Sequence, residues 1–306
     1  MNDRQPGLIQ RAAERLRQQP GAAVASTPAP GSTVSLANPS EMLPLRPPTP
    51  LPDTPESRIS REVKIDRQRL AKEGITFSVN ERSRIAEEFR IISRQILAKA
   101  EGGPGLGGDS PSGRLIMVTS ARPREGKTFT SANLALAISS QRDFRVVAVD
   151  CDIERQSLTR ILGIEADLGL VDVLADPKCD LRDVLLRTDL PNLTVLPAGK
   201  MRPGVPELLS SRRMKDVMVE MAHRYSDRYL ILDAPPCLAT SDPSILASIV
   251  GQIVFVVEAN RTQQPEIEES LRLISTCENI SLVLNKSAGT ASDYFGSYGY
   301  YQGARG

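Results

Sequence analysis

The stretch that decides the fold reads LIMVTSARPREGKTFT, from Leu115 to Thr130. Its first part, Leu115–Thr119, is short and apolar, which is typical of a strand buried on both faces of a parallel sheet. A turn follows, and the segment Thr128–Ser139 has the pattern of a helix. A turn between a strand and a helix N-terminus directs several backbone N–H groups at one point, where the helix dipole also favours negative charge. The stretch therefore predicts an anion-binding turn.

The end of this turn is suited to hold phosphate. Gly126 permits close approach, Lys127 can reach the β- and γ-phosphates of a nucleoside triphosphate, and the Thr128 hydroxyl can bind Mg²⁺. The strict pattern GxxxxGK[ST] requires a glycine at the position of Ala121, so the match is incomplete. The strand–turn–helix context nevertheless favours a nucleotide-binding P-loop, residues 119–128, over a purely structural turn.

Strands and helices alternate along the chain that follows the P-loop. Five further apolar segments predict strands: Arg145–Val149, Leu193–Leu196, Tyr229–Leu232, Gln252–Val257 and Ser281–Leu284. Three more segments predict helices: Pro206–Ala222, Asp242–Ser248 and Pro265–Cys277. This alternation predicts an α/β fold, a P-loop NTPase whose mostly parallel sheet is flanked by helices on both faces.

Aspartates end two of the predicted strands. Asp150 and Asp152 close the second strand, and Asp233 closes the fourth. Open α/β sheets bind their ligands at the carboxyl ends of the strands, and carboxylate oxygens are suitable ligands for Mg²⁺. Each aspartate could instead cap a loop or a helix, but two such strand ends together with a P-loop favour a metal site.

The remainder of the chain divides by composition. Residues 1–19 predict a short amphipathic helix, which is either a marginal surface helix or a docking peptide. Residues 20–57 contain ten prolines and predict a disordered linker. Residues 58–100 predict a helical segment, 101–113 a Gly-rich loop and 114–290 the P-loop core.

The C-terminal segment, residues 291–306, predicts a flexible tail rich in tyrosine. Four of the six tyrosines in the chain lie there, Tyr294, Tyr298, Tyr300 and Tyr301. The segment is too rich in glycine for a packed helix. A tail that packs on the core is the alternative, but a row of phosphorylatable hydroxyls on a flexible arm explains the composition better.

Composition narrows the class of protein. Lys and Arg total 38 against 37 Asp and Glu, a balance that argues against a broad electrostatic grip on nucleic acid. A single histidine and four cysteines without a CxxC pair give no zinc-ligand spacing. Cys151 and Cys237 fall at predicted buried strand ends, as expected in a reducing cytoplasm. With no apolar run of about 20 residues, we expect a cytoplasmic protein that reaches the inner membrane only through a partner.

Taken together, these motifs resemble the bacterial tyrosine kinases of capsule and exopolysaccharide synthesis, a branch of the P-loop ATPases related to the partition and septum-placement ATPases. The resemblance rests on these elements: the P-loop, Asp150-x-Asp152, Pro206-Glu207-Leu208-Leu209, Asp233-Ala234-Pro235-Pro236, Leu284-Asn285-Lys286 and the tyrosine cluster. Glu87-Glu88-Phe89-Arg90 is similar to the helix through which these kinases form rings. The chain looks closest to the free-standing cytoplasmic autokinases of exosortase-linked loci.

The resemblance implies transfer of the γ-phosphoryl group of ATP, with Mg²⁺, to the tail tyrosines of a neighbouring subunit. It implies these nucleotide-binding residues: Glu125, Gly126, Lys127, Thr128, Phe129 and Asn285. It assigns Mg²⁺ to Thr128, Asp152 and Asp233, and catalysis to Lys127 with Asp150 or Asp152 as the base. The implied partners are further copies of the chain, a membrane polysaccharide co-polymerase and a phosphotyrosine phosphatase.

Three positions depart from the family pattern. Arg124 replaces a glycine of the P-loop, Glu154 stands where many members carry an arginine, and Ser93 occupies an often basic position in the ring-forming helix. Two alternatives therefore stay open beside the kinase. One is a partition-type ATPase with a structural tail, and the other is a nucleotide-binding regulatory subunit.

Overall fold

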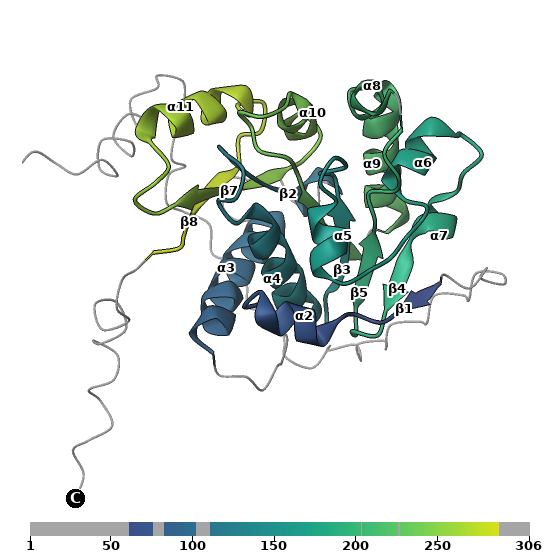
Figure 1. Cartoon of the computed structure of the whole chain (residues 1–306), viewed down its shortest axis with the longest axis horizontal. Helices are drawn as coiled ribbons and strands as arrows, with labels where there is room; N and C mark the ends of the chain where they lie inside the picture. The colour runs from purple at the N-terminus through teal and green to yellow at the C-terminus, as the bar shows by residue number, and fades with distance from the viewer. Residues whose placement is uncertain (1–60, 76–82, 102–110, 203, 226, 288–306) are drawn as a thin grey trace, which may run out of the picture. The chain divides into compact units, whose positions relative to one another are not determined.

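The computed structural model describes residues 61–75, 83–101, 111–202, 204–225 and 227–287 (Figure 1). The predicted N-terminal helix at 1–19, the linker at 20–57 and the tail at 291–306 lie outside these described residues, as does most of the predicted Gly-rich loop.

Eight strands of the described chain form one sheet in the order β1-β4-β5-β3-β6-β2-β7-β8 (Figure 1). Their bounds are Glu62–Val63 (β1), Leu115–Ser120 (β2), Arg145–Asp150 (β3), Leu186–Thr188 (β4), Leu193–Leu196 (β5), Arg228–Asp233 (β6), Gln252–Glu258 (β7) and Ile280–Asn285 (β8). Neighbouring strands are parallel except β4 and β5, which are antiparallel. The predicted α/β class with a mostly parallel sheet is confirmed.

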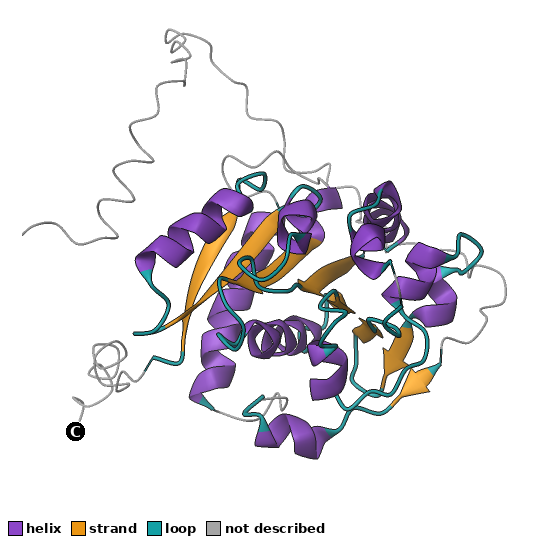
Figure 2. Cartoon of the chain, turned by 45° about the horizontal axis from the view of Figure 1, so that its top comes forward, coloured by secondary structure: helices purple, strands orange, loops and turns teal. Residues whose placement is uncertain are grey.

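Helices cover both faces of this sheet (Figure 2). The first face carries α2 (Arg67–Lys72), α3 (Arg84–Ala100), α4 (Lys127–Ser139) and α5 (Ser157–Ile161). The second face carries α6 (Leu170–Ala175), α7 (Leu181–Val184), α8 (Val205–Leu209), α9 (Arg212–Arg224), α10 (Asp242–Ala247) and α11 (Gln264–Leu273). A 3₁₀ turn, η1 (Pro111–Arg114), leads into β2.

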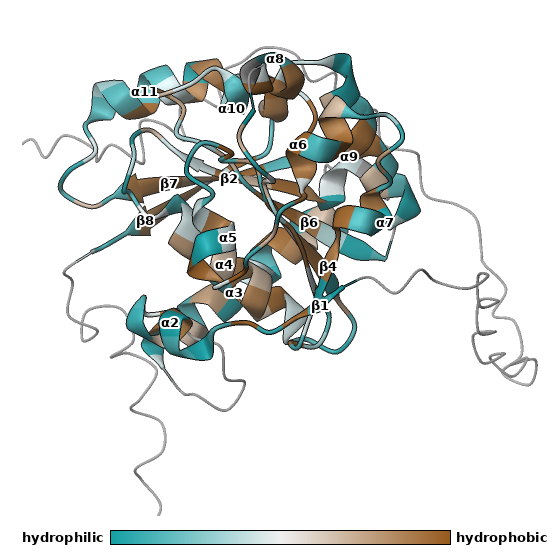
Figure 3. Ribbon diagram, turned by 45° about the vertical axis from the view of Figure 1, so that its right-hand side comes forward, coloured by the Kyte–Doolittle hydropathy of each residue, from teal (hydrophilic) through white to brown (hydrophobic). Residues whose placement is uncertain are grey.

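Alternation along the central strands builds the two cores. In β2, Ile116 and Val118 pack with the α4 side of the sheet, whereas Leu115 and Met117 pack with the α9 side. Successive side chains of a strand point to opposite faces, so a run of apolar residues such as Leu115–Val118 serves both cores. Figure 3 shows the same division, with apolar ribbon concentrated on the central strands and on the helix surfaces that meet them.

Helix α3 supports the helix that follows the P-loop. It begins at the N-cap Ser83, whose hydroxyl accepts a hydrogen bond from the Ala86 N–H, and it buries Phe89, Ile96 and Leu97. The Phe89 ring meets the Phe129 ring of α4 edge to face, with 5.9 Å between the centroids. The predicted helical segment therefore packs against α4 rather than standing apart from the core.

The six predicted strands are confirmed, whereas several short elements were missed. Strands β1 and β4 and helices α2, α5, α6 and α7 span at most six residues, too few to show a period in sequence. The predicted helix Pro206–Ala222 was wrong as one element. It divides into α8 and α9, because Ser211 caps a new helix by accepting a hydrogen bond from the Met214 N–H.

Cys151 and Cys237 are buried as predicted, and all four cysteines are free thiols. In the part of the chain that the structure describes, no helix combines the length and the apolar content required to cross a bilayer.

Candidate active site

The predicted site residues meet because three strands are neighbours. The order β3-β6-β2 places the carboxyl ends of these strands side by side, and Asp150 pairs in register with Asp233. The P-loop leaves β2 at the same edge and enters α4 at Lys127. The sheet therefore brings together at one edge the acidic residues and the P-loop, which are separated in sequence.

Two residues of the P-loop, Gly126 and Arg124, adopt the left-handed backbone conformation. Gly126 has a φ of 103°, and a Cβ built there would lie 1.9 Å from Nδ2 of Asn285. A side chain at this position would therefore clash with Asn285 as well as strain the backbone. Arg124 also adopts the left-handed conformation, with a φ of 71°. A glycine, which the resemblance leads us to expect at this position, would adopt this conformation without strain.

The β8 side of the P-loop is fixed by side-chain hydrogen bonds. Asn285 Nδ2 donates to the Glu125 carbonyl over 2.9 Å, and Lys286 Nζ donates to the Arg124 carbonyl over 2.6 Å. The Glu125 carboxylate accepts from the Arg122 N–H at 2.8 Å and from the Thr262 hydroxyl. The structure thus places Asn285, predicted to contact nucleotide, against the backbone of the loop.

Lys127 lies between two buried carboxylates. Its Nζ donates to Asp152 Oδ2 over 2.6 Å and is 4.0 Å from Asp233 Oδ1. All three residues are buried. Burial lowers the pKa of Lys127, but the charges of Asp233 and Asp152 more than offset it, so the pKa is raised overall. Lys127 is therefore charged at neutral pH and offsets part of the negative charge of the two aspartates.

Two hydroxyls of α4 complete this cluster. Thr128 Oγ1 donates to Asp233 Oδ2 over 2.8 Å, and Ser131 Oγ donates to Asp233 Oδ1 over 2.9 Å. Burial raises the pKa of Asp233, while Lys127 and the two hydroxyls act in the opposite direction. Ser131 was missed in the sequence, although its place one helical turn after Lys127 puts it on the face that meets the strand ends.

Asp150 is placed differently from Asp152. Its Oδ2 accepts from the N–H and the hydroxyl of Thr159, at 2.8 and 2.7 Å, so it holds α5 against the sheet. Among the described residues its Oδ1 has no partner. Burial, followed by the charge of Asp233, raises the pKa of Asp150 to about 7. Of the two predicted base candidates, the structure brings Asp152 to Lys127, whereas Asp150 is fully buried beneath α5.

The oxygen atoms around Lys127 suit Mg²⁺. The Thr128 hydroxyl and the carboxylates of Asp152 and Asp233 are hard oxygen donors, the type that this ion prefers. Within the described ranges, no group of three or more acidic, cysteine or histidine side chains forms a cage of its own. This donor set fits an ion that takes one or two carboxylates from the protein and its other ligands from phosphate and water.

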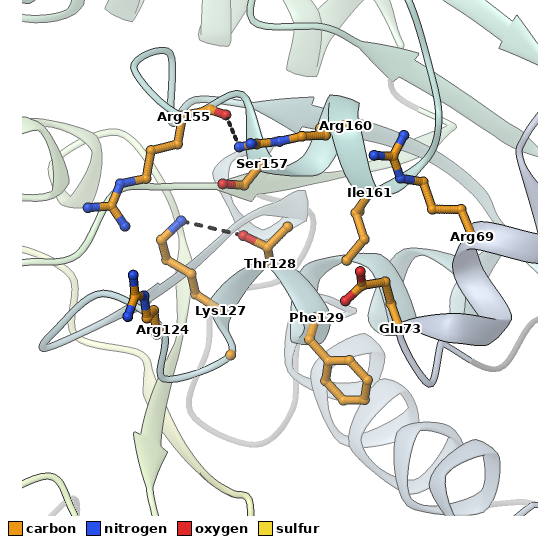
Figure 4. Close-up of a pocket in the computed structure, with 11 residues that line it drawn as sticks. Arg69, Glu73, Arg124, Lys127, Thr128, Phe129, Arg155, Ser157, Arg160 and Ile161 are labelled. Carbon is orange, nitrogen blue, oxygen red and sulfur yellow. Dashed lines mark hydrogen bonds between the residues drawn. The ribbon is translucent and has the colours of Figure 1, made fainter.

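A basic pocket opens beside the P-loop on the side away from β8. It measures about 400 Å³ and receives four arginines: Arg69 of α2, Arg124 of the P-loop, and Arg155 and Arg160 beside and in α5 (Figure 4). Lys127, Thr128 and Phe129 form the boundary that it shares with the P-loop. The sequence did not single out Arg69, Arg155 or Arg160, because they come from two short helices that carry no motif.

A model of the AAA domain family matches residues 113–287, more than half of the chain. Tyrosine-protein kinase YwqD of Bacillus subtilis (strain 168) is 30% identical over 190 residues, which are 61% of this chain and 77% of that protein. The chain belongs to the bacterial tyrosine kinase family. The resemblance predicted from the motifs is thereby confirmed.

Other members of the tyrosine kinase family differ in length. The tyrosine-protein kinase wzc of Salmonella typhimurium is 32% identical over 190 residues, which are 61% of this chain but only 26% of that protein. The chain therefore spans about a quarter of that longer relative. The crystal structure of the VpsO kinase domain is 27% identical, has a TM-score of 0.55, and covers 66% of this chain and 96% of that domain.

Proposed function

We propose that this protein is an ATP-dependent tyrosine kinase that phosphorylates its own C-terminal tail and thereby regulates exopolysaccharide or capsule synthesis. The observation that carries the proposal is the buried Lys127, held between Asp152 and Asp233 beside the Thr128 hydroxyl at the end of a P-loop. Membership of the bacterial tyrosine kinase family supports the same reaction.

The first task of the site is to bind the triphosphate. The first N–H groups of α4 have no acceptor within the helix and are directed at the position of a phosphate. Lys127 would exchange its carboxylate partners for phosphate oxygens, while Thr128 and Asp233 would hold Mg²⁺ with Asp152 nearby. Bound there, Mg²⁺ would neutralise charge on the phosphates, the main requirement of phosphoryl transfer beyond positioning.

The second task is to activate the acceptor. A tyrosine hydroxyl has a pKa near 10 and needs a base at neutral pH. Asp152 is the better placed candidate, because Lys127 would leave it for the phosphates, whereas Asp150 is fully buried and bonded to Thr159. The acceptors would be Tyr294, Tyr298, Tyr300 and Tyr301 of a neighbouring copy.

Phosphorylation would then act as an assembly switch. Each phosphotyrosine adds about −1.5 to −2 charge, so crowded tails would repel one another and separate the subunits. A membrane polysaccharide co-polymerase would bring the kinase to the inner membrane, and a phosphatase would reset it. Equal sedimentation of the phosphorylated and unphosphorylated proteins would contradict this switch.

The reaction is tested by incubating the purified full-length protein with Mg-ATP and mapping phosphate by mass spectrometry. Phosphotyrosine within residues 294–301 that is lost in Lys127→Met supports the kinase, and Lys178→Met, which removes an exposed lysine, is the matched control. Phosphate released to solvent without labelled tyrosine would indicate a partition-type ATPase. Nucleotide binding without either product would indicate a regulatory subunit.

A further inference from the structure

The basic pocket beside the P-loop is lined by more positively charged side chains than carboxylates. Four arginines line it, and the acidic lining found in the described chain is Glu73. No carboxylate of the described residues lies within salt-bridge distance of Arg69, Arg124 or Arg155. In contrast, Arg122 of the same loop pairs with Glu266. The pocket therefore has the charge of a site for an anion.

The four arginines divide into two groups in space (Figure 4). Arg124 and Arg155 lie on the Lys127 side of Thr128, where the nucleotide phosphates would bind. Arg69 lies on the opposite side, beyond Ile161, and the chain of Arg160 runs between the two sides. Arg160 donates to the Arg155 carbonyl and keeps further N–H groups for a ligand. Lys127, the P-loop N–H groups and Mg²⁺ would hold the triphosphate, and we assign the Arg69 side of the pocket to a second ligand.

Two residues that line this pocket are apolar. Phe129 and Ile161 line the pocket and are half-buried, so each offers carbon surface to a ligand. An aromatic ring that carries a phosphate would match this combination, because its ring can pack on carbon and its phosphate can accept from guanidinium groups. The tail is the part of this chain that would carry such a group.

We propose that this pocket binds a phosphotyrosine of the tail through Arg69 and Arg160, while a neighbouring tyrosine of the same tail is phosphorylated. This inference rests on the proposed kinase function and adds a substrate preference to it. Residues 288–306 contain one acidic residue, Asp293, and one basic residue, Arg305, so the unphosphorylated tail is uncharged overall and gains little from a basic pocket. One phosphotyrosine adds about −1.5 to −2 charge, so the pocket selects tails that already carry phosphate.

The spacing of the tyrosines agrees with a two-site substrate. Tyr298, Tyr300 and Tyr301 lie within three residues of one another, a span of at most about 10 Å in an extended chain. One ring can therefore occupy the pocket while the next reaches the P-loop. In the second transfer the bond between the γ-phosphorus and the ADP oxygen breaks, a bond to the phenolic oxygen forms, and the phenolic proton passes to the base. Without the arginines, two phosphates so close together would repel each other.

Binding is measured first, with synthetic peptides of residues 288–306 that carry either no phosphate or one phosphate on Tyr298. The receptor is the full chain with its four tail tyrosines changed to phenylalanine, so that its own tail carries no phosphate. We expect the phosphopeptide to bind about tenfold more tightly than the plain peptide, and the preference to weaken with salt. If the two peptides bind equally well, the proposal is overturned, and no variant of the pocket is needed to show it.

The variants then assign the site. The double change Arg69→Gln with Arg160→Gln should remove the preference for the phosphopeptide, while Arg142→Gln, which removes an exposed arginine beyond the other end of α4, should retain it. Affinity for a non-hydrolysable ATP analogue with Mg²⁺ should stay unchanged in the double variant. Loss of nucleotide affinity with an unaltered peptide preference would mean that the arginines serve ATP, and inorganic phosphate competing as well as the phosphopeptide would mean that the ring is not recognised. Either result would overturn the proposal.

A time course of intact mass with the native tail separates this inference from the proposed function. The double variant should form singly phosphorylated protein at the wild-type rate and multiply phosphorylated protein about tenfold more slowly. Equal accumulation of multiply phosphorylated forms would overturn the inference while leaving the kinase intact. Absence of any phosphotyrosine in the wild type would instead contradict the kinase, and the peptide measurement would still report on the pocket.

Discussion

The two sides of the P-loop are built in opposite ways. On the β8 side, Asn285 and Lys286 donate to loop carbonyls at 2.9 and 2.6 Å, and the Glu125 carboxylate is held by further donors. On the α2 and α5 side, no carboxylate in the described ranges pairs with Arg69, Arg124 or Arg155, which line an open pocket. The polar groups that set the shape of the loop form hydrogen bonds within the protein, whereas the arginines that would contact a ligand have no carboxylate partner in the described residues.

Lys127 lies between these two sides, and we expect its replacement to cause the largest loss of stability and activity. Lys127→Met leaves Asp152 and Asp233 buried without their cation, so we expect a loss of about 3 kcal/mol in unfolding free energy without Mg²⁺ or nucleotide. Urea unfolding at pH 7 measures it, with Lys178→Met as control. Tyrosine labelling should be lost in the same variant. Unchanged stability would show that the buried cluster is not held by Lys127.

The β8 side is tested next, through Asn285. Asn285→Asp replaces an N–H donor with a carboxylate that faces the Glu125 carbonyl, so we expect a loss of about 2 kcal/mol in stability. Nucleotide affinity should fall with it, because the loop is no longer held. Asn260→Asp, at an exposed position after β7, is the matched control for the charge. Weaker nucleotide binding with full stability would instead assign Asn285 to direct contact with the nucleotide.

The next prediction concerns Asp150, whose carboxylate holds α5 beside the basic pocket. The pKa of Asp150 is about 7 in the folded chain, whereas its ordinary value, which we take for the unfolded chain, is 3.8. Between pH 6 and pH 8 the folded state therefore releases a proton that the unfolded state has already lost. Stability from this group is full below pH 3.8 and is lost as the pH rises through 7. We expect a fall of about 1.4 kcal/mol between pH 6 and pH 8 without Mg²⁺. Asp150→Asn should flatten this fall, and an equal slope in both proteins would contradict the prediction.

The smallest effect concerns the strain in the P-loop itself. Arg124 has a φ of 71°, which glycine adopts without cost. Arg124→Gly should therefore raise stability by about 0.5 kcal/mol, after the entropy of glycine in the unfolded chain is subtracted. Arg124→Ala removes the same charge but keeps the strain, so it should not gain stability. Thermal unfolding that ranks the alanine variant above the glycine variant would contradict this.

The sequence predicted the long, buried strands of this sheet better than its short strands and the helices between them. Apolar runs such as Leu115–Val118 are visible because a strand buried on both faces is mostly apolar. The two-residue β1 and the six-residue α2 have no such pattern, yet α2 supplies Arg69 to the pocket. The split between α8 and α9 depends on the hydroxyl of Ser211, which looks like any other serine in sequence.

The sequence by itself determined the P-loop, the aspartates at the strand ends and the family, because these depend on residue type at fixed spacing along one strand and turn. The tertiary structure alone decided how each group is used. Asp152 reaches Lys127 while Asp150 turns to Thr159, Asn285 holds the loop, and Arg69 and Arg160 line one pocket. The physical reason is that the direction of a side chain at a strand end is set by the helices packed around it, which come from distant parts of the chain.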